Sequence, residues 1–229
     1  MSLDTRHVRA VLIDLDGTLA DTVGDIRCAV NTVLGAFARP PLAAHTVAAY
    51  VGSGVDVLLH RALGGGPDAH IGAAELERAR ALFLPAYAAV NGRHARLYPG
   101  VAAGLAALRA QGLGLACVTN KPERPAADLL ARLGLADHFA CLVGGDTLAQ
   151  RKPDPQPLQH AAALLGVPLG ACIMLGDSAI DAAAARAAGI PIVLVDYGYR
   201  GGAPIESLDA DRVVPGIDAL ARLLARDPA

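Results

Sequence analysis

The feature that most constrains this chain is an apolar run from Val8 to Ile13 that ends abruptly in two acids one residue apart, Asp14 and Asp16. Its length and β-branched content predict a buried strand. Open α/β folds bind their ligands at the carboxyl ends of such strands, so both acids are predicted to lie at a ligand-binding edge. Side chains alternate along an extended chain, and Asp14 and Asp16 therefore point the same way if the extension persists. Gly17 then permits a turn that a side chain would obstruct.

Two carboxylates at this spacing repel each other unless one is protonated or a cation joins them. A hard divalent ion with oxygen ligands fits best, and Mg²⁺ is the common choice in phosphate chemistry. A polar turn without chemistry is the simplest alternative, and a calcium-binding EF-hand loop is a sharper one. The EF-hand fails on detail, because its invariant glycine would fall at Leu19 and its twelfth-position glutamate at Asp25.

The second half of the chain repeats one pattern four times after Tyr98–Gly100: a helix, then a glycine, then a strand. This alternation is typical of a parallel sheet with crossover helices, so it predicts an α/β fold with a Rossmann-like core. The first strand, which carries Asp14, is predicted to join the same sheet. The predicted helix and strand pairs are 101–110 with 113–118, 124–133 with 139–143, 156–165 with 171–175, and 179–188 with 192–195.

A block with no convincing strand pattern separates the first strand from the rest of the predicted sheet. Its predicted helices cover residues 22–37, 43–50, 55–63 and 73–89, with a clear break at Gly64–Pro67. The sequence therefore predicts a discontinuous catalytic core, residues 1–20 and 96–229, and an all-helical cap inserted into it, residues 21–95. Because the insert begins directly after the acid pair, we expect it to cover the site.

Polar residues follow the predicted strands of this sheet. Thr119 and Asn120 end the second strand, Lys152 follows the third, and Asp177 ends the fourth, with Asp181 one turn further on. Taken singly, each is typical of a turn, a helix cap or a surface loop. The strand ends of a parallel sheet converge on one edge, however, so these residues can meet although they are distant in sequence.

The acids in this set suit the transfer of a phosphoryl group from a phosphate monoester. Such a transfer needs a nucleophile, a proton donor for the leaving oxygen, and cations around the phosphoryl oxygens. Asp14 can attack as a carboxylate, and Asp16 can protonate the leaving group and then activate water. Asp14 and Asp177 can hold Mg²⁺, with Asp181 orienting the groups around the metal.

The remaining polar residues can bind phosphate or balance charge. Thr119 and Asn120 can hydrogen-bond phosphoryl oxygens, and Lys152 can balance the clustered acids. Lysine is scarce in this chain: Lys121 and Lys152 are its only two, and arginine serves everywhere else. Both positions are therefore predicted to need a compact ammonium group.

Four motifs resemble, in order, those of the haloacid dehalogenase superfamily. They are Asp14–Thr18, Thr119–Asn120, Lys152–Pro153, and Gly176–Ser178 with Asp181. The resemblance covers nearly the whole chain, including a helical cap inserted after the first motif. The chain looks most like the phosphoglycolate phosphatase branch, through Asp21–Thr22, Val51–Gly54, Tyr98–Val101 and Gly176–Ser178.

The resemblance implies a Mg²⁺-dependent phosphatase that acts on a small phosphorylated metabolite, with 2-phosphoglycolate as the best choice. It implies that Asp14 is the nucleophile that forms an aspartyl-phosphate and that Asp16 is the general acid and base. It also implies that Asp14, the Asp16 backbone carbonyl and Asp177 bind Mg²⁺. One departure is Ile180, where many relatives carry asparagine; we expect it to alter hydrogen bonds near the metal more than the reaction type.

Other chemistries of the same superfamily stay open to different degrees. A dehalogenase would not need Asp16, and a phosphonate hydrolase of this kind needs a cap lysine that residues 21–96 lack. A sugar phosphomutase, or a phosphatase for sugar phosphates or pyrophosphate, keeps every core residue and stays open. A phosphoacceptor signalling module is the non-enzyme alternative, but such modules are shorter and have no helical insert.

Cap residues facing the site are expected to select the leaving group. The candidates are Arg27, Arg61 and the turn Gly52–Ser53–Gly54. Backbone amides near Ser53 can receive a small carboxylate such as that of glycolate, which is a hypothesis resting on this turn alone.

Composition restricts the partners. The formal net charge of −2 gives no reason to expect nucleic acid or an anionic membrane. The four cysteines contain no CxxC pair, which argues against zinc and indicates a reducing compartment. With no signal segment or membrane span in the sequence, we expect a soluble cytoplasmic protein that is a monomer or a homodimer.

Overall fold

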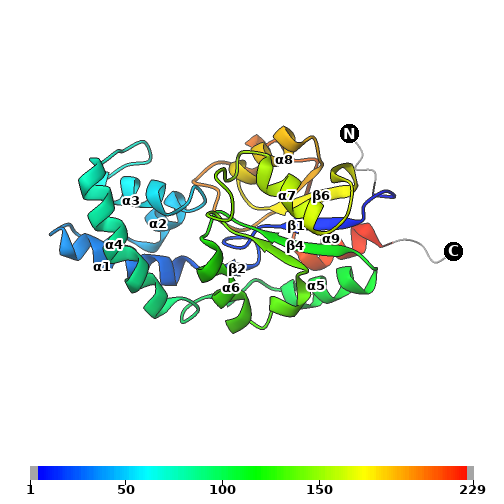
Figure 1. The fold of residues 1–229 in the computed structure, drawn as a ribbon, viewed down its shortest axis with the longest axis horizontal. Helices are drawn as coiled ribbons and strands as arrows, with labels where there is room; N and C mark the ends of the chain where they lie inside the picture. Colours follow the sequence, from blue (N-terminus) through cyan, green and yellow to red (C-terminus); the bar gives the residue numbers. More distant parts are fainter. Residues whose placement is uncertain (1–4, 226–229) are drawn as a thin grey trace.

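The computed structural model describes residues 5–225 and has two lobes (Figure 1). The larger lobe contains a six-stranded sheet with the order β5-β4-β1-β6-β7-β8, in which all neighbouring strands are parallel. Its strands are β1 (Ala10–Ile13), β4 (Gly114–Val118), β5 (Cys141–Val143), β6 (Cys172–Gly176), β7 (Ile192–Val195) and β8 (Arg212–Val214). The predicted α/β fold with a parallel, Rossmann-like sheet is confirmed.

Strand β1 shows how the sequence specifies a three-layer core. Its four side chains are fully buried and alternate between two apolar clusters on opposite faces of the sheet. Val11 and Ile13 pack on the face covered by α5 (Val101–Ala110), α6 (Glu123–Arg132) and α9 (Ile217–Leu224). Ala10 and Leu12 pack on the face covered by α7 (Gln156–Leu164) and α8 (Ala179–Ala188). Both faces are therefore shielded, and the polar strand ends are left for the site.

The smaller lobe is built from the inserted helices. They are α1 (Val23–Ala36), α2 (Ala44–Tyr50), α3 (Val55–Gly64) and α4 (Ala73–Val90). Their apolar faces form a third cluster, separate from the two around the sheet, with Val30, Leu59 and Phe83 in its interior. This agrees with the predicted helical cap, which Figure 1 shows beside the carboxyl-terminal edge of the sheet.

A short antiparallel ribbon joins the two lobes where the sequence predicted no strand. β2 (Ala20–Asp21) pairs with β3 (Arg96–Leu97), with Ala20 opposite Leu97. The ribbon forms because the chain leaves and re-enters the core at adjacent points. We propose domain boundaries at residues 20–21 and 95–96, as the sequence predicted, since both crossings fall within this ribbon.

None of the helices described between residues 5 and 225 is long and apolar enough to cross a membrane.

Candidate active site

The acid pair lies at the carboxyl end of β1, as predicted. The Asp14 backbone N–H donates to the Leu175 carbonyl at 2.9 Å, so the extended pairing with β6 continues one residue past the strand. Asp14 is buried and Asp16 is partly buried, and both line the same pocket.

Lys152 neutralises part of the acidic charge at this edge. Its Nζ donates to Asp14 Oδ1 at 2.8 Å, to Asp181 Oδ1 at 2.7 Å and to the Val118 carbonyl at 2.7 Å. Burial lowers the pKa of Lys152, but Asp14 and Asp181 raise it by more, and the ammonium stays charged. The ammonium group thus contacts two of the clustered acids, and a catalytic role for Lys152 stays a prediction.

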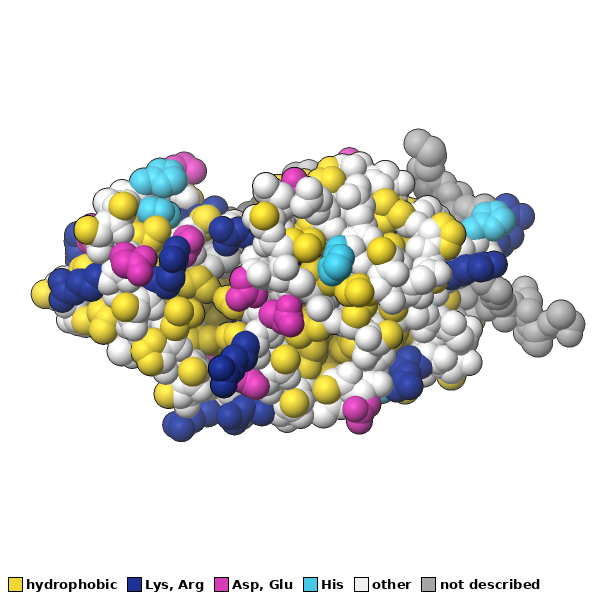
Figure 2. Space-filling view, in the orientation of Figure 1, with side chains coloured by type: hydrophobic (Ala, Val, Ile, Leu, Met, Phe, Trp, Pro, Cys, Tyr) yellow, Lys and Arg dark blue, Asp and Glu magenta, His cyan; other side chains and the backbone are white. Residues whose placement is uncertain are grey.

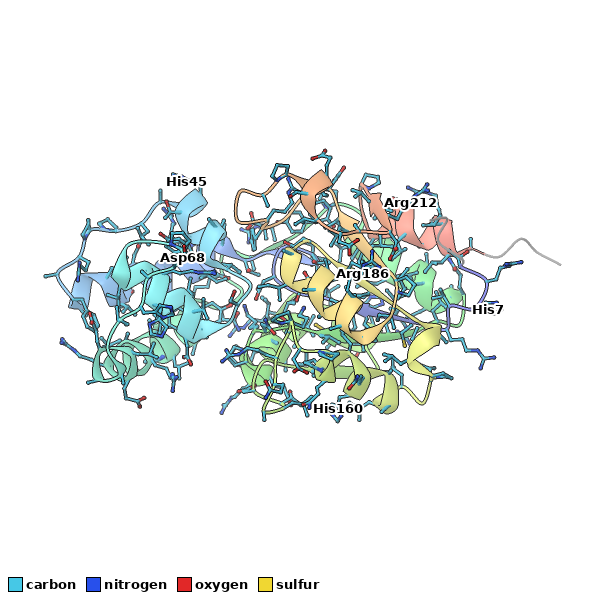
Figure 3. All side chains as sticks on the ribbon, turned by 90° about the horizontal axis from the view of Figure 1, so that it is seen from above. His7, His45, Asp68, His160, Arg186 and Arg212 are labelled. Atoms are coloured by element: carbon cyan, nitrogen blue, oxygen red, sulfur yellow. The ribbon has the colours of Figure 1, made fainter. Side chains whose placement is uncertain are left out.

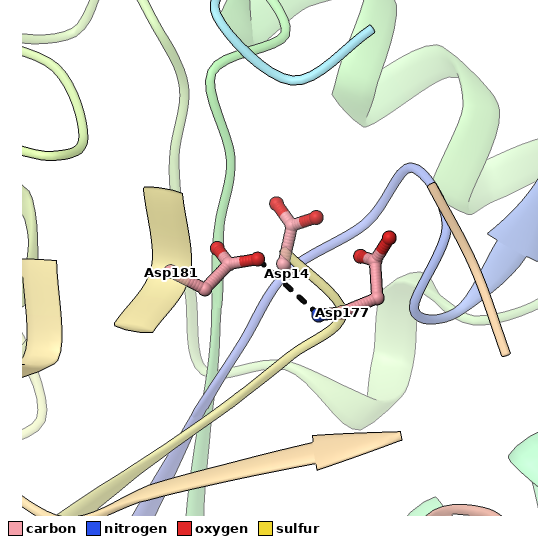
Figure 4. Close-up of side chains that lie close together, drawn as sticks. All are labelled: Asp14, Asp177 and Asp181. Carbon is pink, nitrogen blue, oxygen red and sulfur yellow. Dashed lines mark hydrogen bonds between the residues drawn. The ribbon is translucent and has the colours of Figure 1, made fainter. Parts of the chain in front are cut away.

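Three buried carboxylates lie together around this lysine. Oxygens of Asp14, Asp177 and Asp181 lie within 4.8 Å of one another (Figure 4). Burial raises the pKa of Asp14 to about 7, although Lys152 opposes the rise. Burial, then Asp181 and Asp14, raise the pKa of Asp177 well above its usual range. One ammonium does not balance three carboxylates, so this oxygen-rich cluster is suited to a hard divalent cation.

Neighbouring groups fix the orientation of Asp177. The Thr18 hydroxyl donates to Asp177 Oδ1 at 2.7 Å, and the Tyr199 backbone N–H donates to Oδ2 at 2.5 Å. Gly17 permits this close approach, because it has a φ of +93° and a Cβ there would lie 2.3 Å from Asp177 Oδ2.

Asp181 has both oxygens engaged within the protein. Oδ1 accepts from Lys152, and Oδ2 accepts from the Ser178 hydroxyl at 2.7 Å in the capping box that begins α8. This arrangement is compatible with the predicted role of Asp181, which is to orient the metal's surroundings rather than to bind substrate.

Asp16 is held by a different set of groups from Asp14. The Thr22 hydroxyl donates to Asp16 Oδ1 at 2.7 Å, and Lys121 Nζ lies 2.8 and 2.9 Å from the two carboxylate oxygens. Lys121 also lies 4.8 Å from the ring centroid of Tyr87 on cap helix α4. Burial lowers the pKa of Lys121, but Asp16 raises it by more. The two lysines of the chain thus each pair with one acid of the first motif.

The phosphate-binding candidates lie at the end of β4. Thr119 is buried and lines the pocket. The Asn120 Nδ2 group donates to the carbonyls of Gly52 and Lys152, both at 2.8 Å, and so links the cap turn to the lysine loop. Its side-chain donors are engaged here, and the prediction that Thr119 and Asn120 bind phosphoryl oxygens stays a prediction.

The pocket opens between the lobes, and its empty space of about 740 Å³ is continuous with solvent. Its core side carries the acids and lysines described above, whereas its cap side is apolar, with Ile26, Val55, Leu58 and Phe83 among the lining residues. Figure 2 shows apolar side chains gathered around the recess between the lobes. The charged and the apolar lining residues of the pocket therefore lie on opposite sides, one on the core and one on the cap.

Comparison with known proteins defines the family. The family model for haloacid dehalogenase-like hydrolases matches residues 8–189. The chain belongs to this family of hydrolases. A curated plasmid-encoded phosphoglycolate phosphatase of Cupriavidus necator is 50% identical over 216 residues, covering 94% of this chain and 92% of that protein. A phosphoglycolate phosphatase of Thiobacillus denitrificans is 41% identical over 219 residues, covering 96% of both chains.

The solved structures agree with this assignment. A crystal structure described as a predicted phosphoglycolate phosphatase from Haemophilus somnus superposes with a TM-score of 0.89 at 29% identity, covering 96% of this chain and 99% of that one. The predicted resemblance of this hydrolase to the haloacid dehalogenase superfamily and its phosphoglycolate phosphatase branch is confirmed.

Of the cap residues that were predicted to select the leaving group, only some line the pocket. Gly52 and Gly54 line the pocket, whereas Ser53, Arg27 and Arg61 are not among its lining residues. The Arg61 guanidinium instead donates to the Tyr50 and Pro67 carbonyls within the cap. A role for the turn in substrate binding stays a prediction. The two arginines do not reach the site in this arrangement of the lobes.

Ile180 also lines the pocket. Its Cδ1 lies 3.4 Å from where a Cβ at Gly52 would stand. The residue that departs from the family pattern thus lies beside the cap turn.

Lys121 stands out in the sequence only through the scarcity of lysine, and the sequence predicts no role for it at the site. The sequence also predicts no role for Thr18 or Tyr199. Their contacts with Asp177 join residues that lie far apart in the sequence or outside any local pattern. Among residues 5–225 no histidine lines the pocket, and the histidines labelled in Figure 3 (His7, His45 and His160) lie on outer parts of the lobes.

Proposed function

We propose that this hydrolase is a Mg²⁺-dependent phosphatase that converts 2-phosphoglycolate to glycolate and phosphate through an aspartyl-phosphate on Asp14. The observation that carries the proposal is that the first two acids, Asp14 and Asp16, have different surroundings. Asp14 lies in a carboxylate cluster suited to a cation, whereas Asp16 is held apart by Lys121 and Thr22. These different surroundings support Asp14 as the nucleophile and Asp16 as the group that moves protons.

In the first step, a carboxylate oxygen of Asp14 attacks phosphorus and the bond from phosphorus to the leaving oxygen breaks. Lys152 holds Asp14 Oδ1, which fixes the orientation of the carboxylate for attack. Asp16, protonated, gives its proton to the leaving oxygen, so the product departs as an alcohol rather than as an alkoxide.

In the second step, Asp16 as a carboxylate removes a proton from water, which attacks the aspartyl-phosphate. The phosphorus bond to Asp14 breaks, phosphate leaves, and both acids regain their starting states. Asp14, the Asp16 carbonyl and Asp177 would hold Mg²⁺, which would neutralise charge on the phosphoryl oxygens. Asp177 is oriented for this task by Thr18 and Tyr199, and Asp181 keeps Lys152 in place.

The choice of substrate rests on curated relatives named phosphoglycolate phosphatase, such as those of Cupriavidus necator and Thiobacillus denitrificans, which align over nearly the full chain. We further propose that the protein acts in the cytoplasm on this free metabolite, as a monomer or a homodimer, and uses neither nucleic acid nor membrane as a partner.

Phosphate release tests the proposal directly. The substrates are 2-phosphoglycolate, a panel of sugar phosphates, nucleotides and pyrophosphate, each with and without Mg²⁺, with Asp14→Asn as the blank. We expect Mg²⁺-dependent release with the highest kcat/KM for 2-phosphoglycolate and none in the blank. Broad, weak hydrolysis would retain the chemistry and remove the proposed substrate. No release from any substrate would favour a mutase or a phosphoacceptor module.

A further inference from the structure

We infer that Lys121 is the residue that selects the substrate, by binding the carboxylate that the leaving group carries. The inference rests on the proposed function and deepens it. It follows from three properties of the site: the position of the Lys121 ammonium group, the full engagement of the other lysine that lines the pocket, and the need for Lys121 to find a new partner when Asp16 turns away.

Lys121 lies between the catalytic acid and the cap. Its side chain is 4% exposed, and its ammonium bonds both oxygens of Asp16 on the core side. On the cap side it meets the ring face of Tyr87, which is itself tied to Asn91 by a 2.8 Å hydrogen bond. The ammonium thus borders the space where the leaving group emerges from the phosphoryl site toward the cap.

Within residues 5–225, Lys121 and Lys152 are the only cationic side chains that line this pocket. The guanidinium of the exposed Arg151 lies beside Gly54 but is not part of the lining. Lys152 has three N–H donors and three acceptors already: Asp14, Asp181 and the Val118 carbonyl. The cap wall is apolar and contributes no arginine to the lining. A carboxylate bound against that wall alone would lose its hydration without gaining a partner.

Catalysis itself requires Lys121 to change partners. Asp16 must turn toward the leaving oxygen to protonate it, and it then no longer satisfies both ammonium contacts. A buried ammonium without an anion is strongly unfavourable. A leaving group with its own carboxylate replaces the oxygens of Asp16 on Lys121, so the charge stays paired while the acid is released. A neutral leaving group offers no such exchange. By this exchange, a substrate whose leaving group carries a carboxylate is distinguished from phosphate monoesters whose leaving group is uncharged.

The test compares two substrates that differ in one group. They are 2-phosphoglycolate and 2-hydroxyethyl phosphate, in which an alcohol replaces the carboxylate. The variant is Lys121→Met, which keeps most of the side-chain length and removes the charge. The control is Arg124→Met, which removes one positive charge from an exposed position three residues away.

We expect Lys121→Met to lower the kcat/KM ratio of 2-phosphoglycolate over 2-hydroxyethyl phosphate roughly 10- to 100-fold, the scale of one lost charged hydrogen bond. A general effect on Asp16 cancels in this ratio, because both substrates need the same acid. The Arg124→Met ratio should equal that of the wild type. Hydrolysis of 2-hydroxyethyl phosphate shows that the variant is folded, and Lys121→Gln takes its place if Lys121→Met is not.

An unchanged ratio would overturn the inference, since it would mean that Lys121 contacts the phosphoryl group or only Asp16. Failure of the proposed function gives a different result. In that case the wild type itself would not hydrolyse 2-phosphoglycolate, whatever residue stands at position 121.

Discussion

At the scale of single residues, Asp16 gives the sharpest prediction. We expect Asp16→Asn to lower kcat for 2-phosphoglycolate by at least about 100-fold, because an amide neither protonates the leaving oxygen nor activates water. Mg²⁺ binding should persist, since the buried cluster of Asp14, Asp177 and Asp181 is untouched. Steady-state kinetics and calorimetric titration of Mg²⁺ measure the two effects separately. Near-normal turnover in this variant would refute the acid and base role.

The sequence predicted that Asp14, Asp177 and Asp181 can meet, and in the structure their carboxylates lie together. Asp14 and Asp177 directly follow buried strands and Asp181 lies in the first turn of the next helix, so the fold class alone brings them to one edge of the sheet. Lys121 differs, because its function depends on two groups that lie far away in sequence, Asp16 and Tyr87 on α4. Composition marked it as unusual, but only packing reveals its partners. Asn120 shows the same limit, since its amide reaches across to the cap turn at Gly52.

At the scale of elements, the joint between lobes depends on Asp25 in α1. This carboxylate is fully buried and accepts from the backbone N–H groups of Gly92, His94 and Ala95, at 2.8, 2.8 and 3.2 Å. It therefore connects the first cap helix to the segment that returns to the core. The position that an EF-hand would use for calcium serves here to hold two chain segments together.

Replacing Asp25 should destabilise the protein as a whole. Asp25→Ala leaves three backbone N–H groups without their acceptor, and we expect a loss of about 3 kcal/mol in the free energy of unfolding. For a chain of this size that corresponds to a fall in Tm of roughly 6–12 °C, measurable by calorimetry. Asp25→Asn keeps one acceptor oxygen, so its Tm should lie between that of Asp25→Ala and that of the wild type. A Tm for Asp25→Ala within about 1 °C of the wild type contradicts this account.

Helices and strands could be predicted from the sequence where their residue pattern is local and extends over many residues. The helix–glycine–strand repeat identified β4 to β7 and their helices, but nothing was assigned after Val195. β8 is a three-residue edge strand with two exposed residues, so it carries little periodicity. β2 and β3 have two residues each and exist because Ala20 meets Leu97. α9 was detectable, since Ile217, Leu220, Ala221 and Leu224 form one buried face.

At the scale of the whole molecule, the site links stability to pH and to the metal. Burial raises the pKa of Asp14 from 3.8 to about 7, so the folded protein keeps a proton that the unfolded chain releases above 3.8. Stability from the protonated form is therefore present in acid and is lost as the pH rises through about 7. A divalent cation that binds only the folded, ionised site acts in the opposite direction.

We therefore expect the Tm in a chelator to fall between about pH 5.5 and pH 8, and the increase in Tm caused by Mg²⁺ to widen over the same range. Thermal unfolding with and without saturating Mg²⁺ at both pH values gives the comparison. Asp14→Asn is the matched control: it removes the titrating carboxylate, so the Mg²⁺ effect should be smaller and depend less on pH. An Mg²⁺-induced increase in Tm that is equal at both pH values would show that protons and the metal do not compete for Asp14. In that case Asp14 would already be ionised beside Lys152 at both pH values.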